Sequence, residues 1–241
     1  MNALVTETQR VKQFGFTPSE YDRARINVLK QYESLYNDRD KQRNSTFTKE
    51  YVRHFTEGGY IPGIETEYAL ISQVAQAVPV EQVNKYIQDM IGDTNIVISL
   101  TGPEKEGLAY PTDEELLRDF MKAQQIPVEP YRETLSDEPL IPSLPAPGKI
   151  TESKEDPLFG ATVLTLSNGI KVVLKHTDFK KDEIQMTATS PGGSTLFGNK
   201  DIDNLKVFNE VIELGGLGNF SATDLGKMLA GKKVSCSTSL G

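Results

Sequence analysis

Apolar residues recur at helical spacing through the first half of the chain. The sequence Thr17-Pro18-Ser19-Glu20 has the form of a capping box with proline at the first helical position, which is a strong signal for a helix start. Apolar residues then follow at intervals of three and four, which predicts one long amphipathic helix. The residues of this stripe are Tyr21, Ala24, Val28, Tyr32 and Leu35.

Shorter helices are predicted as far as residue 125. Phe47, Tyr51 and Phe55 form a second apolar stripe, which ends at Gly58-Gly59. Similar patterns predict helices around residues 68–74 and 80–90 and after the capping sequence 111–115. One strand is expected in this half, over the β-branched residues 95–100 between Asp93 and Gly102-Pro103.

After residue 161 the pattern changes to that of strands. Residues 162–166 and 170–175 flank Ser167-Asn168-Gly169, and an Asn-Gly pair between two apolar runs is a strong signal for a β-hairpin. Further strands are predicted over residues 184–189 and 234–238, with a helix between them over residues 204–214. Together these elements predict an α+β fold in which helices pack on one face of a mostly antiparallel sheet.

A proline-rich stretch separates the two halves. Seven of the thirteen prolines lie between residues 126 and 158, where they remove backbone donors and disfavour helix. We therefore predict three regions: a mainly helical part over residues 1–125, a semi-rigid linker over 126–160 and a truncated α/β part over 161–241. Residues 139–142 also fit a PxxP ligand, although such matches are common by chance.

Composition and charge narrow the class of partner. The chain has 241 residues, 37% of them hydrophobic, and a net charge of −8, which fits a folded protein without the basic surface that nucleic-acid binding needs. The most basic stretch, residues 30–43, alternates with acidic residues and is expected to form a solvated helix face. No apolar run is long enough for a membrane span, and the first residues do not resemble a signal peptide.

The chain has few of the residues that a hydrolytic metal site needs. A zinc site requires several imidazole or carboxylate ligands around one ion, and the chain has two histidines, His54 and His176, far apart in sequence. Each is expected to be a surface or packed side chain. The single cysteine, Cys236, lies in a predicted strand with no histidine near it, so it is expected to be structural and leaves the compartment undecided.

Other candidate motifs have ordinary interpretations. Residues 215–218, Gly-Gly-Leu-Gly, follow a predicted helix and match neither a P-loop nor a dinucleotide fingerprint, so a helix end and turn is expected. Glu210 and Glu213 lie three apart on one helix face, a spacing that suits acid/base chemistry but is also usual on a solvated surface. No G-x-S-x-G motif is present, although residue order alone leaves a catalytic triad open.

Several phrases, in their order along the chain, resemble the insulinase/pitrilysin-type zinc metallopeptidase family. Residues 14–24 resemble the segment that opens a long helix in the second subdomain of such enzymes. Residues 166–175, in the predicted hairpin, resemble the segment that begins each half. The phrases are residues 14–24, 61–67, 97–103, 166–175, 190–194, 215–221 and 229–232. The resemblance implies an internal segment of a bacterial, single-chain, two-half member, with two partial domains of the metallopeptidase-like α/β-roll type.

In that family, an inverted His-x-x-Glu-His box binds zinc with a distant glutamate, and the box glutamate activates the metal-bound water. The matching helix here, residues 203–214, has no histidine, so the resemblance implies the end of the first half and the start of the non-catalytic second half. We therefore assign no catalytic, cofactor-binding or metal-binding residue to the chain and place zinc in the parent enzyme.

The expected function is that of a non-catalytic segment of a zinc endopeptidase, which would degrade peptides or unfolded polypeptides inside a two-half chamber. The alternative is a scaffold or binding protein of the same fold without peptidase activity. The expected partners are peptide substrates and the missing half of the parent, and the family favours periplasm or cell envelope over cytoplasm. Unfinished sheet edges predict self-association through residues 184–189 or 234–238.

Overall fold

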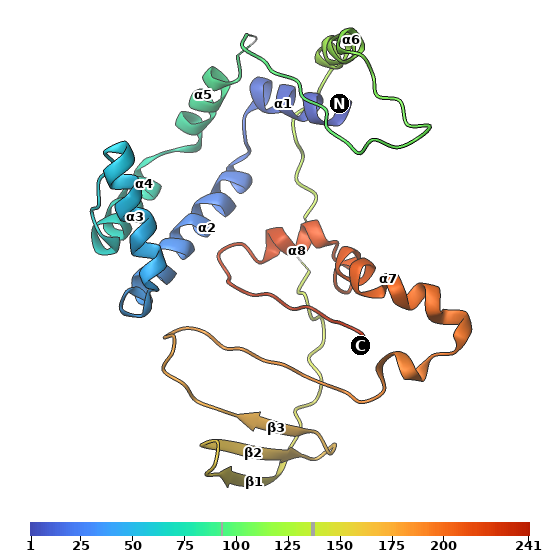
Figure 1. The fold of residues 1–241 in the computed structure, drawn as a ribbon. Helices are drawn as coiled ribbons and strands as arrows, with labels where there is room; N and C mark the ends of the chain where they lie inside the picture. The colour runs from blue at the N-terminus through green and yellow to red at the C-terminus, as the bar shows by residue number, and fades with distance from the viewer. Residues whose placement is uncertain (93, 136–137) are drawn as a thin grey trace. The chain divides into compact units, whose positions relative to one another are not determined.

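The computed structural model describes residues 1–92, 94–135 and 138–241. Helices dominate the first half, and a three-stranded sheet follows the proline-rich stretch (Figure 1). The α-helices are α1 (Asn2–Phe14), α2 (Pro18–Asn37), α3 (Asn44–Glu57), α4 (Ile64–Ala77), α5 (Val80–Met90), α6 (Asp113–Gln124), α7 (Ile202–Ile212) and α8 (Ala222–Met228). The strands are β1 (Ile150–Asp156), β2 (Ala161–Leu166) and β3 (Lys171–Leu174).

The chain divides into two compact units that are discontinuous in sequence. The first unit contains Met1–Leu29 and Ala69–Leu135. The second contains Lys30–Tyr68 together with the sheet and the helices of the C-terminal part. Both boundaries of the inserted segment fall inside helices, α2 and α4.

The predicted helix starts carry the expected caps. At α2, the backbone N–H of Thr17 donates to Glu20 Oε2 over 2.8 Å, and the N–H of Glu20 donates to Thr17 Oγ1 over 3.3 Å. The same reciprocal capping box begins α6, between Thr112 and Glu115. These bonds satisfy N–H groups that have no partner inside a helix, which is why these two starts could be predicted locally.

The turn between α1 and α2 is fixed by a side chain from α5. Asn84 accepts a hydrogen bond from the backbone N–H of Phe16 (2.8 Å) and donates one to the carbonyl of the same residue (3.0 Å). Gly15 has a φ of 69° and lies so close that a Cβ there would clash with the Asn84 amide. Tyr21 in the first turns of α2 donates to the carbonyl of Val78 over 2.6 Å, which adds a second link. The Phe-Gly-Phe-Thr-Pro sequence therefore has a structural role in the first unit.

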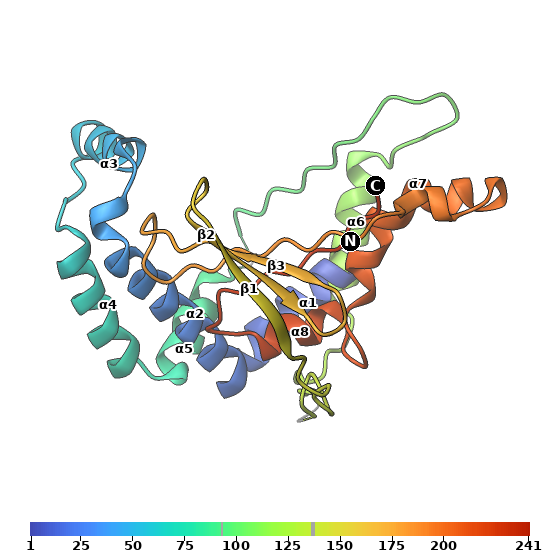
Figure 2. The ribbon, with the colours of Figure 1, turned by 90° about the horizontal axis from the view of Figure 1, so that it is seen from below.

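The sheet is antiparallel with the order β1-β2-β3, and the three strands lie side by side in both ribbon views (Figures 1 and 2). The predicted hairpin is confirmed: Thr162 pairs with Leu174 and Thr165 with Lys171 across the Asn-Gly turn. Strand β1 was not predicted, because it lies within the range assigned to the linker and has the polar sequence ITESKED. Its pairing with β2 shows that the linker assignment was wrong from Ile150 to Asp156, where the backbone is paired.

Three predicted strands are not strands in the structure. Residues 95–100, 184–189 and 234–238 are assigned to neither helix nor strand. Asp93, the predicted boundary of the first of these segments, lies outside the described residues. A strand needs a hydrogen-bonded neighbour as well as β-branched side chains, and these segments have no neighbouring strand among the described residues.

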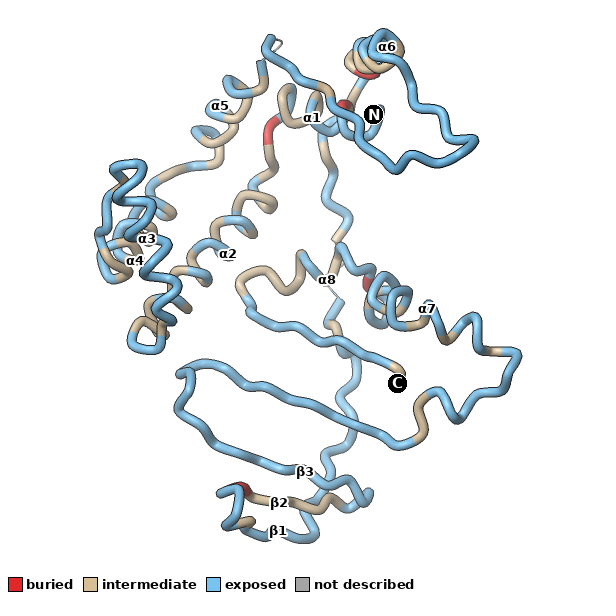
Figure 3. The backbone as a smooth tube through the Cα atoms, viewed as in Figure 1, coloured by how far each residue is buried: buried red, intermediate tan, exposed pale blue. Residues whose placement is uncertain are grey.

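The α+β class is confirmed, but the described elements bury little apolar surface. Among the described residues, four apolar ones are buried, namely Val5, Ala123, Ala161 and Phe220. Figure 3 shows buried residues only as short, separate stretches of a backbone that is otherwise intermediate or exposed. In the described part of the chain, each strand makes its main contacts with another strand, and no helix packs extensively on the sheet. The apolar faces of these elements are therefore largely uncovered.

Candidate functional site: a groove lined by α2, α3 and α4

The candidate site is a groove of about 360 Å³ in the second unit. This volume falls in the range of pockets that hold small ligands or a few side chains of a peptide, roughly 300–1,000 Å³. Its lining comes from the end of α2, the short 3₁₀ helix Arg39–Lys41, one face of α3 and the start of α4. The lining residues are Leu35, Arg39, Gln42, Thr46, Phe47, Lys49, Glu50, Arg53, Gly63, Ile64 and Glu67.

Apolar side chains from three helices contribute to the lining of the groove. Leu35 comes from α2, Phe47 from α3 and Ile64 from α4. A stacked pair of rings, Tyr36 and Tyr68, links α2 and α4 beside the groove, with a centroid separation of 5.1 Å. Aromatic pairs in this geometry add to the stabilisation gained by burial, so this contact helps to hold two of the three helices that line the groove.

The charged residues of the groove fall into two groups. Arg39 is held in place, because it donates to the carbonyl of Tyr36 over 2.8 Å and pairs with Glu65 at 3.2 Å. Its guanidinium also lies over the Tyr36 ring, 4.4 Å from the centroid. Lys49 and Arg53 lie one turn apart on α3, and the spacing of four puts both on the same face of the helix. With Glu50 and Glu67 on the lining as well, the groove combines apolar surface with groups of both charges.

The end of α3 depends on a left-handed glycine. Gly58 has φ 70° and ψ 17°, and its N–H donates to the carbonyl of His54. The sequence prediction that this helix ends at Gly58-Gly59 is confirmed, since glycine adopts this conformation without a steric cost. The cap fixes the last turn of α3 and, with it, the face that carries Arg53.

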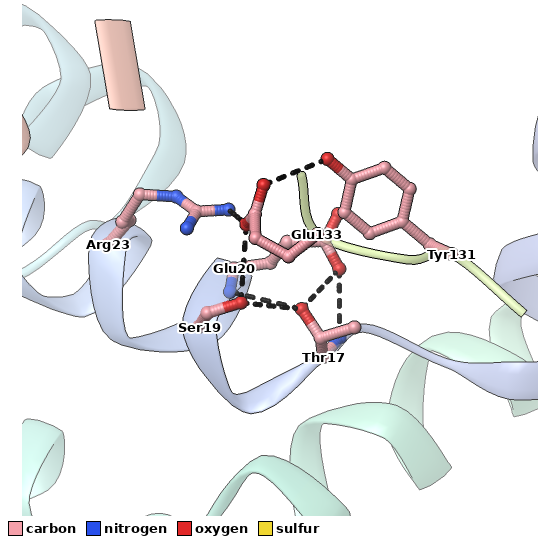
Figure 4. A network of polar contacts seen from close by, with 6 residues as sticks. All are labelled: Thr17, Ser19, Glu20, Arg23, Tyr131 and Glu133. Carbon is pink, nitrogen blue, oxygen red and sulfur yellow. Dashed lines mark hydrogen bonds and ion pairs between the residues drawn. The ribbon is translucent and has the colours of Figure 1, made fainter. Parts of the chain in front are cut away.

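In the first unit, a polar network joins the start of α2 to the segment after α6 (Figure 4). Arg23 Nη2 lies 2.7 Å from Glu133 Oε2, and Ser19 donates to the same oxygen over 3.3 Å. Tyr131 donates to Glu133 Oε1 over 3.2 Å, while Glu20 is held by the cap of the helix. Both carboxylates in this network already accept several hydrogen bonds, which suits a structural junction better than acid/base chemistry.

The two histidines do not form a metal site in the described structure. His54 is in α3, where its Nδ1 is hydrogen-bonded to the carbonyl of Gly59, and His176 is an exposed residue after β3. No group of three or more histidine, cysteine, aspartate or glutamate side chains that could hold a metal occurs among the described residues.

The remaining motifs lie apart from the groove. Cys236 is a free, exposed cysteine, and Glu210 and Glu213 are exposed at the end of α7. The glycine-rich sequence 215–218 forms the predicted turn after that helix, with Gly216 at φ 78° and Gly218 at φ 60°. In the described part of the chain, no helix is both long and apolar enough to cross a membrane.

The basic stretch of residues 30–43 is compensated by acidic neighbours, as predicted for a solvated face. Lys30 donates to Glu33 over 2.7 Å, and this hydrogen bond, with the charge of the carboxylate, raises the pKa of Lys30. Arg39 pairs with Glu65 across the groove lining. These cations are therefore not arranged as a continuous surface for phosphates.

Comparison with known proteins shows what the chain is similar to. No model of a protein family matches the chain. A protein from Arabidopsis thaliana named zinc protease PQQL-like is 27% identical over 221 residues, which cover 92% of this chain and 23% of that protein. The chain is thus similar to a protein named as a zinc protease. The resemblance to insulinase-type zinc metallopeptidases stated from the sequence is thereby confirmed.

Two solved structures of proteases are also similar to this chain. The periplasmic protease PqqL from Escherichia coli is 17% identical, with a TM-score of 0.44. The match covers 100% of this chain and 26% of the PqqL chain. The second structure is a mutant of the ferredoxin protease FusC in complex with Arabidopsis ferredoxin. It is 15% identical, with a TM-score of 0.47, and the match covers 98% of this chain and 26% of the FusC chain. The chain thus spans about a quarter of the length of each of these three proteins.

The groove was not identified from the sequence. The apolar stripe of α3 was recognised, but Lys49 and Arg53 were not singled out. Their spacing of four was the available signal, since it places both on one helix face. The sequence does not indicate that α2 and α4 lie opposite that face, and Glu133 likewise gave no sign of its contact with Arg23.

Proposed function

We propose that this chain is a non-catalytic segment of a zinc-dependent endopeptidase and that the catalytic zinc site is formed by other parts of the enzyme. The similarity to a zinc protease along 92% of the chain carries this proposal. It is supported by the sequence, which has two histidines and no His-x-x-Glu-His box. Two remote imidazoles are too few to hold a hydrolytic metal ion, which uses three protein ligands in catalytic sites.

Within such an enzyme, we propose that the groove contacts the polypeptide substrate. Apolar lining residues such as Phe47 and Ile64 suit an aliphatic or aromatic side chain, and Lys49 and Arg53 suit a carboxylate or backbone carbonyls beside it. The relationship to a zinc protease supports peptide or unfolded polypeptide substrates. A location in the periplasm or cell envelope stays a prediction from the family resemblance.

The first test is metal and activity analysis of the purified chain. We expect clearly less than one zinc per chain and no hydrolysis of an unfolded protein such as reduced casein, with or without added zinc. His54→Ala and His176→Ala should leave the metal content unchanged. Stoichiometric zinc that is lost in either variant would overturn the proposal, because it would require a metal site within these residues.

The alternative function is a scaffold or binding protein of the same fold without peptidase activity. The peptidase and scaffold functions can be distinguished by studying the polypeptide that carries the rest of the family's fold. An intact His-x-x-Glu-His box there, with zinc-dependent peptidase activity when this chain is present, supports the peptidase. A degraded box, together with binding of unfolded polypeptide but no cleavage, supports the scaffold.

A further inference from the structure

Two cations on the lining of the groove have no counterion in the described part of the chain. Lys49 and Arg53 are exposed side chains of α3. Among the described residues, neither forms an ion pair or a side-chain hydrogen bond. Arg39, on the same lining, is by contrast already held by Glu65 and by the carbonyl of Tyr36. Lys49 and Arg53 are therefore the cations that a ligand in the groove can use.

The spacing of these two cations favours an anionic ligand. Residues four apart on a helix have Cβ atoms about 5–6 Å apart, and like charges at this spacing repel each other. A carboxylate bound between Lys49 and Arg53 removes this repulsion and accepts charge-assisted hydrogen bonds from both side chains. This face of α3 therefore fits one carboxylate better than a neutral or a cationic group.

The two carboxylates of the lining limit what else the ligand can carry. Glu50 and Glu67 are half-buried, and in the described structure no ion pair joins either of them to Lys49 or Arg53. Each can accept a hydrogen bond from a backbone N–H of an extended peptide, but each repels a further acidic side chain. The groove therefore fits a peptide with one acidic residue better than a run of acidic residues.

The apolar lining residues determine what fits beside that acidic residue. Leu35, Phe47 and Ile64 line the same groove as the two cations, and the groove has a volume of about 360 Å³. An aromatic or aliphatic side chain that enters it leaves water and gains the free energy of apolar burial. The lining as a whole thus fits a large apolar side chain next to a single carboxylate.

We propose that the groove is specific for a polypeptide segment in which a large apolar residue is adjacent to one glutamate or aspartate, whose carboxylate is bound by Lys49 and Arg53. This specificity rests on the proposed contact between the groove and a polypeptide substrate. The net charge of the chain is −8, so its overall field attracts cationic peptides and repels acidic ones. A preference for an acidic peptide therefore requires a local cationic site.

Tryptophan fluorescence tests the proposal, because the chain has no tryptophan of its own. Three short peptides, acetylated and amidated at their ends, carry tryptophan followed by glutamate, glutamine or lysine, so no terminal carboxylate competes. We expect the chain to bind the glutamate peptide about five-fold more tightly than the glutamine peptide, the change that corresponds to about 1 kcal/mol. The lysine peptide should bind most weakly. At about 1 M ionic strength, where the screening length is about 3 Å, the preference should shrink.

Variants of the groove separate charge recognition from apolar contact. Lys49→Gln combined with Arg53→Gln should lower the affinity for the glutamate peptide to that for the glutamine peptide. Phe47→Ala should instead weaken all three peptides by the same factor, because it removes apolar surface and no charge. Lys49→Glu combined with Arg53→Glu should make the lysine peptide the tightest ligand, and loss of folding cannot produce such a reversal.

The matched control is Arg43→Gln, which removes one positive charge just before α3 at an exposed residue that is not on the groove lining. It should leave the preference for glutamate unchanged. Circular dichroism should show the same helix content in all variants as in the unmodified chain.

The results distinguish this specificity from the contact on which it rests. If the three peptides bind equally and Phe47→Ala weakens them, the groove contacts polypeptide but the preference for an acidic residue is wrong. If none of the three binds, both the contact and the preference are wrong. A preference that persists without Lys49 and Arg53, or that is lost in Arg43→Gln, would place the carboxylate elsewhere and overturn the proposal.

Discussion

At the scale of single residues, the positions that decide local structure are those where chemistry leaves few options. Thr17 and Thr112 begin helices because each hydroxyl satisfies an N–H that would otherwise lack a partner. Gly58 ends α3 because it can adopt a left-handed conformation. Such effects act over a few residues, which explains why they were visible in the sequence without knowledge of the fold.

A substitution at Gly58 would test the effect of backbone conformation alone on the stability of the α3 end. No atom lies within 4 Å of the position that a Cβ would take at Gly58, so Gly58→Ala adds no clash. The left-handed φ alone should lower the free energy of unfolding by about 1 kcal/mol. Hydrogen exchange of the last turn of α3 should become faster in the same variant, and urea unfolding followed by circular dichroism would give the loss of stability.

Gly226 supplies the matched control, because it lies within α8 and a Cβ at this position would likewise meet no atom within 4 Å. Its backbone is helical rather than left-handed, so Gly226→Ala should raise stability by roughly 0.5–1 kcal/mol through helix propensity. Opposite signs for the two substitutions are expected. A loss of stability in both variants would contradict this explanation of the α3 end.

At the scale of elements, contacts between helices distant in sequence hold the first unit together. Asn84 of α5 binds both backbone groups of Phe16, and Tyr21 of α2 binds the carbonyl of Val78. The two bonds from Asn84 replace the partners that the α1–α2 turn lacks within its own segment. The sequence predicted the helices on either side of this turn, but the link to α5 depends on a residue 68 positions away.

Replacing Asn84 should therefore affect the turn more than the helix that carries it. Asn84→Ala leaves the N–H and carbonyl of Phe16 without partners in a partly buried position, at a cost of about 1–3 kcal/mol in the free energy of unfolding. Asn84→Asp keeps the acceptor and loses the donor, so an intermediate loss is expected. Urea titration with hydrogen exchange of residues 14–18 measures both effects.

An exposed residue of the same helix serves as the control for this comparison. Gln82 is exposed and lies in the first turn of α5, so Gln82→Ala should change stability by less than about 0.5 kcal/mol. Equal losses in Asn84→Ala and Gln82→Ala would mean that α5 itself, and not the turn, is the sensitive element.

At the scale of the whole molecule, the chain exposes many large apolar side chains. Ile184 and Met186 are 96% and 86% exposed, in one of the segments predicted to be a strand. The two outer strands of the sheet differ in character. Strand β1 carries alternating charges, among them Glu152, whose pKa is lowered by a hydrogen bond and the charge of Lys154, whereas β3 is KVVL. Charges on an edge strand oppose further pairing, so β3 and the unpaired segments are the positions open to association.

We therefore predict that the chain self-associates through its unpaired extended segments. Light scattering after size-exclusion chromatography should show species larger than a monomer that increase with concentration. Ile184→Lys should shift the distribution toward monomer, because a lysine on an edge blocks strand addition. Leu158→Lys, at an 82% exposed position in the β1–β2 turn, is the control and should have little effect. A monomer at all concentrations would refute the prediction.

The sequence by itself determined the features that depend on neighbouring residues: the capped starts of α2 and α6, the glycine end of α3, the Asn-Gly hairpin and the absence of a zinc box. The sequence also carried the family resemblance, because the similar segments can be recognised by their order along a single chain. The tertiary structure decided which segments are paired, so that polar residues 150–156 form a strand while β-branched residues 95–100 do not. It also decided the groove and the contact between Arg23 and Glu133. The physical reason is that strand pairing, pocket lining and ion pairs between distant residues depend on partners that no local pattern identifies.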